Sequence, residues 1–377
     1  MSKVPMLMRS VRGALALAAV LFTASVPVGA QEVIKIGLAW PLTGALAGFG
    51  KDIQRVFPMA EADINVKGIN GRKVQFVLED SRSTPEGGIA AFRKLVEVDK
   101  VVSVQSIFTN IVTAQIPLSD QLKIPLVSTV EAPGLSARGQ YTFQHSAGFA
   151  NILPVLSQHM KLIGAKRIYA FFPDSSYGEL LSPRFSTALK ATGAEYADAR
   201  FKFGQSDYRG NAARAKEYNP DFIIVTGQGT ADDGNLIRQL REIGITIPIY
   251  PAANVYGIKS WRESVGSYVT GMTMAGPDFE ESDPVTKDFL TRFRARYGED
   301  PQYSVGLNYD LLRMVASAVE KAGTDGNAIR NYLANLKDFP SVTGAKVSMD
   351  AEHQTRLPVF LLREQGGKLV RIKVGEK

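Results

Sequence analysis

Residues 34–40 read Ile34-Lys35-Ile36-Gly37-Leu38-Ala39-Trp40. This run alternates at first and then becomes continuously apolar, which is typical of a buried strand. A glycine-rich loop follows at 41–50, and residues 51–65 have the spacing of a helix. Because ligands of open parallel sheets bind outside the carboxyl ends of the strands, we expect the loop at 41–50 to border a cleft.

The same unit of strand, loop and helix recurs to about residue 271 and forms two sets. We predict the further strands of the first set at 73–78, 101–105 and 124–128, and those of the second at 167–172, 195–201, 221–226 and 247–250. Helices separate these strands, so both sheets should be parallel, with right-handed crossovers. The rest of the chain is mostly helical and ends in a hairpin at 359–363 and 369–374, so it should pack onto the existing sheets.

The first thirty residues are predicted to be a secretory signal peptide, cut after residue 30. Three basic residues precede an apolar run at 14–22 and a stretch of small residues. The alternative is an N-terminal membrane anchor, but the run falls well short of the roughly 20 residues that span a bilayer. We therefore expect an exported protein.

Charge and cysteine usage narrow the class of protein further. Loss of the signal peptide removes three positive charges from a formal charge of +7 and leaves +4. The basic residues are scattered, so no nucleic-acid partner is expected. Cysteine is absent, which excludes disulfides and the thiol on which bacterial lipoproteins are anchored. This favours a soluble protein of a Gram-negative periplasm.

No motif of catalysis or of cofactor binding stands out. The three histidines are far apart in the sequence, so no metal cluster is expected. The segment Gly227-Gln228-Gly229 is like the start of a dinucleotide fingerprint, but Asp232 and Asp233 would repel a pyrophosphate at the helix that follows. We expect these two acids to cap that helix instead. The sequence therefore predicts neither an enzyme nor a bound cofactor or metal.

A set of short motifs, each weak alone, occurs in a consistent order along the chain. The motifs are Ile34-Lys35-Ile36-Gly37, Thr43-Gly44 to Phe49-Gly50, Ala60-Glu61-Ala62-Asp63-Ile64-Asn65, Glu79-Asp80, Ile124-Pro125-Leu126-Val127-Ser128, Asp174-Ser175-Ser176-Tyr177-Gly178 and Pro220-Asp221-Phe222-Ile223. Because it contains this ordered set of motifs, the chain resembles the branched-chain amino acid-binding proteins of ABC transporters, which are type I periplasmic binding proteins.

The resemblance implies an α/β fold with two Rossmann-like lobes joined by a three-crossover hinge. Lobe 1 would comprise residues 32–146 and 277–350, and lobe 2 residues 147–276 and 351–377. The protein would be the periplasmic solute-binding component of an ABC importer, a monomer that delivers a small carboxylate-bearing solute to an inner-membrane permease. That solute would be a branched-chain or other amino acid, or an aromatic or aliphatic carboxylate. The alternative is an extracytoplasmic ligand sensor with the same two lobes.

The resemblance also assigns residues to the cleft between the lobes. Phe49 matches an aromatic residue of the wall, and Thr109 matches a hydroxyl that holds the ligand carboxylate. Val130 matches a backbone contact, and Tyr177 a tyrosine that closes over the ligand. Local chemistry supports the assignment of Thr109, because Asn110 is expected to open a helix whose free amides attract anions. Alternatively, Thr109 could be only the cap of that helix.

Further aromatic residues could line the same cleft. Phe108 and Tyr256, with Phe49 and Tyr177, would suit an apolar or aromatic carboxylate as well as leucine.

Two departures from the family pattern bear on the ligand. Ala132 stands where a second hydroxyl is expected, although Thr129 or Glu131 could replace it. The acid that holds a ligand ammonium should lie near residues 251–254, where Asn254 stands and no acid is present. A buried ammonium without a counter-charge is costly. Either Glu131 or Asp232 supplies that charge, or the ligand has no ammonium.

Overall fold

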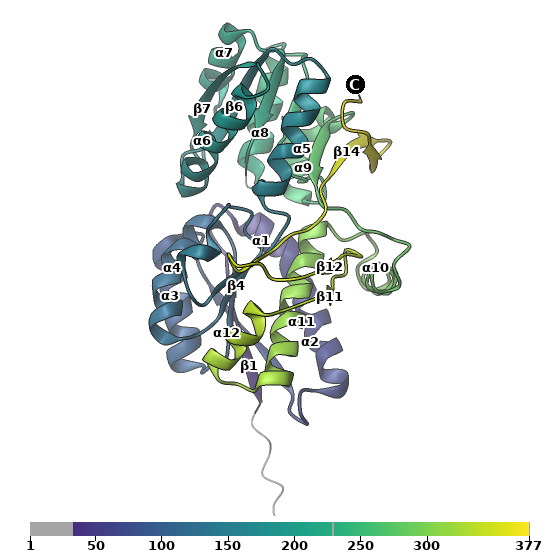
Figure 1. Ribbon diagram of the computed structural model, residues 1–377. Helices are drawn as coiled ribbons and strands as arrows, with labels where there is room; N and C mark the ends of the chain where they lie inside the picture. Colours follow the sequence, from purple (N-terminus) through teal and green to yellow (C-terminus); the bar gives the residue numbers. More distant parts are fainter. Residues whose placement is uncertain (1–32, 228–229, 377) are drawn as a thin grey trace, which may run out of the picture. The chain divides into compact units, whose positions relative to one another are not determined.

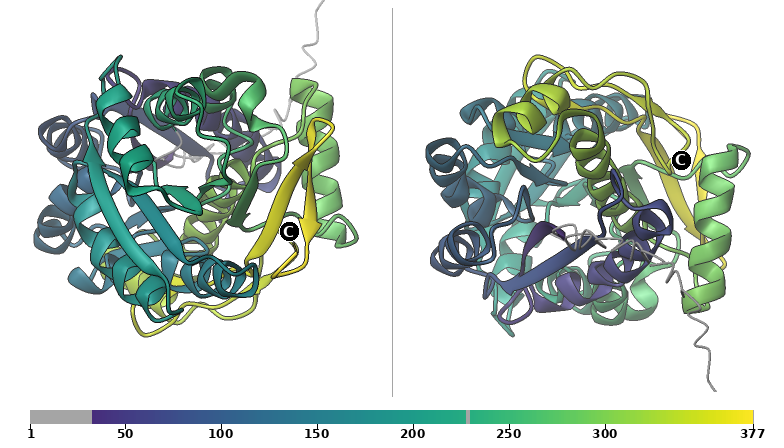
Figure 2. Two further views of the ribbon diagram at one scale, coloured as in Figure 1. Left: turned by 90° about the horizontal axis from the view of Figure 1, so that it is seen from above. Right: turned by 90° about the horizontal axis from the view of Figure 1, so that it is seen from below.

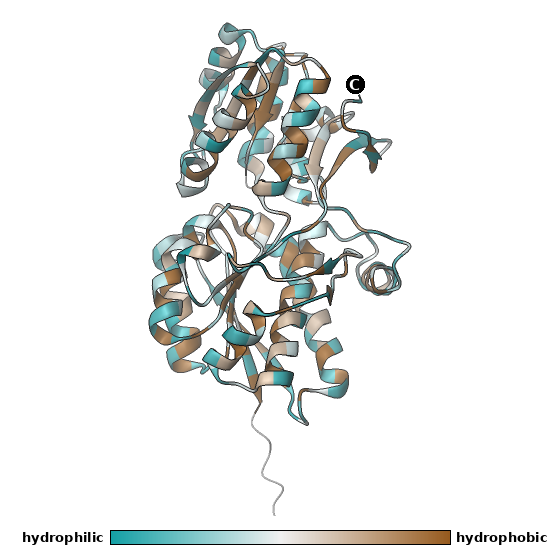
Figure 3. Cartoon of the chain, in the orientation of Figure 1, coloured by the Kyte–Doolittle hydropathy of each residue, from teal (hydrophilic) through white to brown (hydrophobic). Residues whose placement is uncertain are grey.

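The computed structural model describes residues 33–227 and 230–376 (Figure 1). The predicted signal peptide lies outside the described residues. From Val33 onward the chain forms one unit that contains two parallel sheets and the helices around them. The strands are mostly apolar, and the outward faces of the helices are mostly hydrophilic (Figure 3).

The first sheet has six strands in the order β13-β5-β4-β3-β1-β2, and all its pairings are parallel. Its strands are β1 (Ile34–Trp40), β2 (Val74–Asp80), β3 (Val104–Ser106), β4 (Leu126–Ser128), β5 (Thr142–His145) and β13 (Gln354–Thr355). Strands β2 and β3 lie on opposite sides of β1, so the connections that leave β1 and β3 diverge. A crevice at the carboxyl ends of these strands follows from that order.

Helices cover both faces of the first sheet (Figure 1). Helices α3 (Pro85–Arg93) and α4 (Thr109–Leu122) pack together on one face, while α2 (Val56–Lys67), α11 (Tyr303–Ala322) and α12 (Gly326–Ala334) pack together on the other. Shorter helices are α1 (Ala47–Gln54), η1 (Lys94–Val98) and η2 (Ser136–Arg138). Helix α3 begins with a threonine cap, because the hydroxyl of Thr84 accepts a hydrogen bond from the Gly87 amide at 3.0 Å.

The second parallel sheet has four strands in the order β7-β6-β8-β9. Its strands are β6 (Arg167–Pro173), β7 (Glu195–Phe201), β8 (Phe222–Val225) and β9 (Ile249–Pro251), and its helices are α5 (Phe149–Leu162), α6 (Ser176–Lys190), α7 (Arg209–Tyr218), α8 (Ala231–Glu242), α9 (Lys259–Val265) and η3 (Gly266–Val269).

The predicted closing hairpin is confirmed. Strands β14 (Phe360–Gln365) and β15 (Lys368–Ile372) pair antiparallel, and β14 also pairs with β10 (Thr273–Gly276). This hairpin is yellow in Figure 2. Helix α10 (Pro284–Tyr297) follows β10 in the chain. Two further short strands, β11 (Phe339–Pro340) and β12 (Lys346–Val347), pair with each other.

The chain passes three times between the two parts that contain these sheets. The first passage lies between β5 and α5, the second between β10 and α10, and the third between β13 and β14 (Figure 1). This agrees with the predicted three-crossover hinge.

Three details differ from the sequence prediction. The helix expected at 51–65 is divided into α1 and α2. Strand β5 was not predicted, because its buried residues are mostly polar, as in Gln144 and His145, and give no apolar pattern. Strand β13 pairs with β5, so residues 354–355 lie in the first sheet, beyond the expected limit of lobe 1 at residue 350.

The outer edge of the first sheet is covered by side chains of α2. The Phe76 amide of β2 donates to the carboxylate of Glu61 at 2.7 Å. The Val74 amide donates to Asn65 Oδ1 at 2.8 Å, and Asn65 Nδ2 donates back to the Val74 carbonyl at 2.7 Å. These contacts occupy backbone groups that would otherwise be open at a sheet edge.

A buried polar cluster holds the first and third passages together. His145, at the end of β5, has Nδ1 at 2.6 Å from the Thr355 hydroxyl in β13 and Nε2 at 3.5 Å from Asp310 Oδ2. Asp310 is fully buried and also accepts from Arg313 at 2.7 Å and from the Val342 amide at 2.9 Å. One carboxylate of α11 therefore contacts two other segments, β5 and the connection that contains Val342.

We expect Asp310→Ala to destabilise the protein by about 3–5 kcal/mol, because it leaves Arg313 and the Val342 amide without their buried acceptor. Urea unfolding measures this change. The matched control is Asp300→Ala, which removes an exposed partner of Arg294 and should cost about 1 kcal/mol or less. Equal losses in the two variants would contradict the role assigned to Asp310.

Candidate functional site

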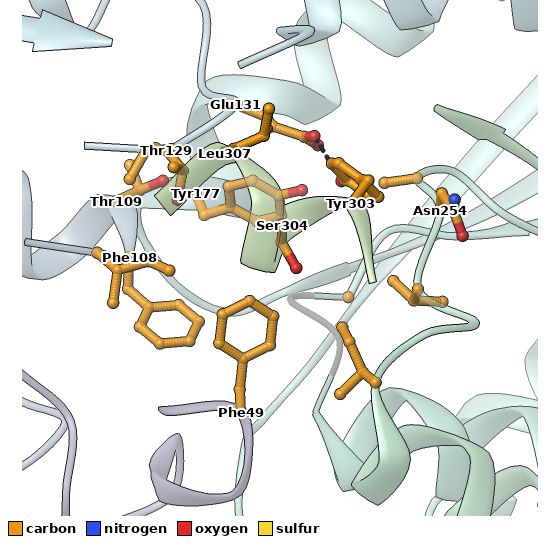
Figure 4. Close-up of a pocket in the computed structure, with 16 residues that line it drawn as sticks. Phe49, Phe108, Thr109, Thr129, Glu131, Tyr177, Asn254, Tyr303, Ser304 and Leu307 are labelled. Atoms are coloured by element: carbon orange, nitrogen blue, oxygen red, sulfur yellow. Dashed lines mark hydrogen bonds between the residues drawn. The ribbon is translucent and has the colours of Figure 1, made fainter. Parts of the chain in front are cut away.

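A single pocket gathers most of the residues that the sequence placed at the cleft, but not Tyr256 or Asp232 (Figure 4). Sixteen described residues line it: Phe49, Ile107, Phe108, Thr109, Thr129, Val130, Glu131, Tyr177, Gly227, Ala253, Asn254, Val255, Ile258, Tyr303, Ser304 and Leu307. They come from α1, the connections after β3 and β4, the start of α11, the start of α6 and the connections after β8 and β9. The pocket thus joins the carboxyl ends of both parallel sheets, and the binding role of its residues stays a prediction.

The start of α4 is formed differently from the prediction. Thr109 is the first residue of the helix, and Phe108 stands at the cap position without a side-chain cap. The interpretation of Thr109 as a capping residue is therefore wrong. Its hydroxyl is buried and has no hydrogen-bond partner among the described residues. The first turn of α4 carries no acidic residue, so its free amides keep their attraction for an anion.

Phe108 has an unusual backbone conformation, with φ 71° and ψ 131°. Gly148, at the cap position of α5, has nearly the same angles, φ 68° and ψ 144°. Glycine adopts this region readily, whereas a side chain makes it costly, by about 1–3 kcal/mol. In return, the Phe108 ring lies 5.2 Å from the ring of Phe49, edge to face, in the pocket wall.

Glu131 is the one acidic residue among the described residues that line the pocket. No described lysine, arginine or histidine lines it. Its carboxylate accepts a hydrogen bond from the Tyr303 hydroxyl at 2.8 Å. Burial raises the pKa of Glu131 to about 7, and the hydrogen bond from Tyr303 only partly offsets this. Tyr177 lies in the same pocket, and burial raises the pKa of its hydroxyl, with smaller contributions from the charges of Glu131 and Asp233.

Among the described residues, the wall formed by the second sheet carries no acid of its own. Asn254 lines the pocket, and its Oδ1 is buried without a hydrogen-bond partner among the described residues. Gly227 also lines it, and a Cβ at this position would lie 2.1 Å from the carboxyl carbon of Asp233. Asp233 caps α8 through Thr230, as predicted, and burial raises its pKa to about 7. Its carboxyl group thus stands directly behind the pocket wall.

Two other expectations for this region are wrong. Asp232 does not line the pocket; its Oδ1 accepts from the Tyr208 hydroxyl at 2.7 Å and from the Gly204 amide at 3.0 Å. Tyr256 does not line the pocket either, and its ring lies 5.5 Å from the guanidinium of Arg262. Glu131 is therefore the remaining candidate for a ligand ammonium.

Residues missed by the sequence prediction include three from α11 and others from the connections after β3, β8 and β9. Tyr303, Ser304 and Leu307 line the pocket from a helix that follows Glu131 by more than 170 positions. The one signal in the sequence was an aromatic residue at the start of a predicted helix. Buried amides also support the loop after β4: Gln144 donates to the Val130 carbonyl at 2.7 Å, and Asn308 to the Thr129 hydroxyl at 3.4 Å.

The fold and the pocket define a binding protein built from two α/β lobes. Residues 33–368 match the family described as periplasmic binding protein, so the chain belongs to that family. The described residues include no helix long and apolar enough to cross a membrane. Family membership places the protein in the periplasm or an equivalent extracytoplasmic space.

Individual relatives agree with the predicted family. The Leu/Ile/Val-binding protein BraC3 of Rhizobium johnstonii is 26% identical over 90% of this chain and 94% of its own length. The structure of a branched-chain amino acid-binding protein from Streptococcus pneumoniae with isoleucine superposes with a TM-score of 0.81 at 26% identity, covering 90% of this chain and 98% of that one. A solute-binding protein of R. palustris with benzoate gives a TM-score of 0.80 at 19% identity, covering 91% and 96%. These findings confirm the predicted family and fold.

The strain at Phe108 predicts a difference between two substitutions. Phe108→Gly and Phe108→Ala remove the same ring, but only glycine accepts the observed backbone angles without strain. We expect the glycine variant to be more stable by about 1 kcal/mol, after allowing for its larger loss of chain entropy. Urea unfolding of both variants measures the difference, and a more stable alanine variant would rule out strain at this position.

Proposed function

We propose that this protein is the solute-binding component of an ABC importer and that it holds a small solute by its carboxylate, without catalysis. The observation that carries the proposal is the hydroxyl of Thr109. It is buried at the first turn of α4, has no hydrogen-bond partner in the described part of the chain, and lies inside a pocket with largely apolar walls. A buried polar group of this kind is costly unless a ligand satisfies it.

The start of α4 suits a carboxylate better than a cation. The first amides of a helix lack partners within the helix and carry a partial positive charge. A carboxylate at this position would accept hydrogen bonds from these amides and from Thr109. The rest of the solute would lie against apolar residues, among them Ile107, Leu307 and Ile258, and against the rings of Phe49 and Phe108.

The names of similar proteins support two classes of solute. One relative is named as a Leu/Ile/Val-binding protein, and one structural neighbour holds isoleucine. Other neighbours hold benzoate and hydroxybenzoate. All these compounds carry one carboxylate and an apolar or aromatic body, which matches the chemistry of the pocket.

We further propose that the two lobes close over the solute. Lobe 1 would comprise residues 32–146 and 277–350, extended to include β13, and lobe 2 the remainder of the described chain. Phe49 and Thr109 would bind from lobe 1, and Tyr177 and Asn254 from lobe 2. Closure would remove water from the carboxylate and strengthen its hydrogen bonds.

The proposed setting follows from the sequence and the family. The signal peptide at 1–30 would be cleaved on export, and without cysteine no lipid anchor would be attached. The mature protein would act as a monomer in a Gram-negative periplasm and deliver its solute to an inner-membrane permease.

Calorimetric titration of refolded, ligand-stripped protein tests this proposal. The probes are leucine, phenylalanine, isocaproate and hydrocinnamate, which pair two amino acids with the acids of the same carbon skeletons. We expect at least one of these four probes to bind. The amides of leucine and phenylalanine, which lack the carboxylate, serve as controls and should not bind. Equal binding of an amide and its acid would reject the role of the carboxylate.

Thr109→Val should weaken the binding of a carboxylate probe by about 1.5–3 kcal/mol, which is one hydrogen bond to a charged group. The substitution keeps the shape of the side chain, so the fold should be unaffected. Thr113→Val is the matched control. Thr113 lies one turn further along α4 and does not line the pocket, and its buried hydroxyl also lacks a partner among the residues that the structure describes. Equal dissociation constants for the two variants would contradict the assignment.

A further inference from the structure

We propose that the ionisation of Glu131 selects the class of solute. The charged carboxylate would pair with the ammonium of an amino acid, whereas the neutral acid would admit a carboxylate that has no ammonium. The preference for one class over the other would therefore reverse with pH. This inference rests on the proposed function and concerns the same pocket.

The position of Glu131 is the first support. Its carboxylate is the one charged group among the described residues that line the pocket, and it accepts a hydrogen bond from the hydroxyl of Tyr303. Its backbone is fixed from the other side, because its carbonyl accepts from the Phe149 amide at 3.0 Å. Figure 4 shows the side chain beside Tyr303 at the edge of the space enclosed by the lining residues. A solute bound at Thr109 therefore meets this carboxyl group within the same pocket.

Of the titratable groups that face Glu131, Tyr303 partly stabilises its charge by a hydrogen bond, and none of them supplies a positive charge. Tyr303 comes from α11 and Tyr177 from α6, and burial keeps both hydroxyls neutral. Asp233 stands behind Gly227 on the side of the second sheet, close enough that its charge acts on Tyr177. Among the described residues no cation lines the pocket. The pKa of Glu131 accordingly lies at about 7 in the empty pocket.

The two solute classes should shift this equilibrium in opposite directions. An ammonium close to Glu131 stabilises the carboxylate, so an amino acid would release a proton from Glu131 to the solvent on binding. A solute with only a carboxylate is repelled by the charged form and would bind with uptake of one proton by Glu131. Affinity for amino acids should therefore fall as the pH decreases below about 7, and affinity for plain acids should fall as the pH increases above about 7.

The experiment is calorimetric titration of the four probes from about pH 5.5 to about pH 8.5, in pairs of buffers with different ionisation enthalpies. Leucine or phenylalanine should lose affinity about tenfold per pH unit at the acidic end, and isocaproate or hydrocinnamate about tenfold per unit at the alkaline end. The paired buffers count the protons released or taken up. Binding with no pH dependence and no proton exchange would overturn the inference and leave the proposed function intact. No binding of any probe would reject both.

Variants identify the titrating group. Glu131→Gln should abolish the pH dependence for both classes. Asp233→Asn is the matched control, because it removes the other buried acid near Tyr177, and it should leave the dependence unchanged. The reverse pattern would assign the titration to Asp233 and overturn the proposal.

Tyr303→Phe provides a second test that keeps the acid in place. The hydroxyl of Tyr303 favours the charged form of Glu131, so its loss should move the transition to higher pH. A transition that stays in place or moves to lower pH would contradict the role of Glu131.

Discussion

Buried polar groups need partners, and this requirement shapes both the rigid parts of the molecule and its pocket. At some points around the first sheet the requirement is met by amide and carboxylate side chains: Gln144 supports the loop after β4, and Asp310 accepts from Arg313 and from the Val342 amide. At the start of α4 it is not met, because the hydroxyl of Thr109 has no partner among the described residues. Other buried hydroxyls, such as that of Thr113, also lack a described partner, but Thr109 lines the pocket, where a solute can supply one.

The connections between the two sheets are tied to each other as well as to the sheets. His145 ends the strand that leads into the first passage, and Thr355 lies just before the third. Their contact in the core means that the two passages start from one fixed point. If the two lobes move against each other, these two passages would therefore bend beyond the fixed point, at residues 146–148 in the first passage and 356–359 in the third.

The sequence predicted the parts of the structure that leave a local pattern. The apolar run at 34–40 gave β1, and the order of strands and helices gave two parallel sheets. Strand β5 was not predicted, because its buried residues are mostly polar and their hydrogen-bond partners lie far away in the sequence. Tyr303 was not predicted to line the pocket for a similar reason, because its contact with Glu131 depends on how α11 packs against the first sheet. The positive φ of Phe108 could not be predicted from the local sequence either, because phenylalanine is not a residue type that favours this conformation.

The covered edge of β2 has a consequence for assembly. A strand from another molecule could extend the first sheet only by displacing Glu61 and Asn65 from the backbone groups that they occupy. At the opposite edge, β13 offers only two residues to an incoming strand. Addition of a strand from another molecule is thus hindered at both edges of this sheet, by side chains that cover the start of β2 and by the shortness of β13.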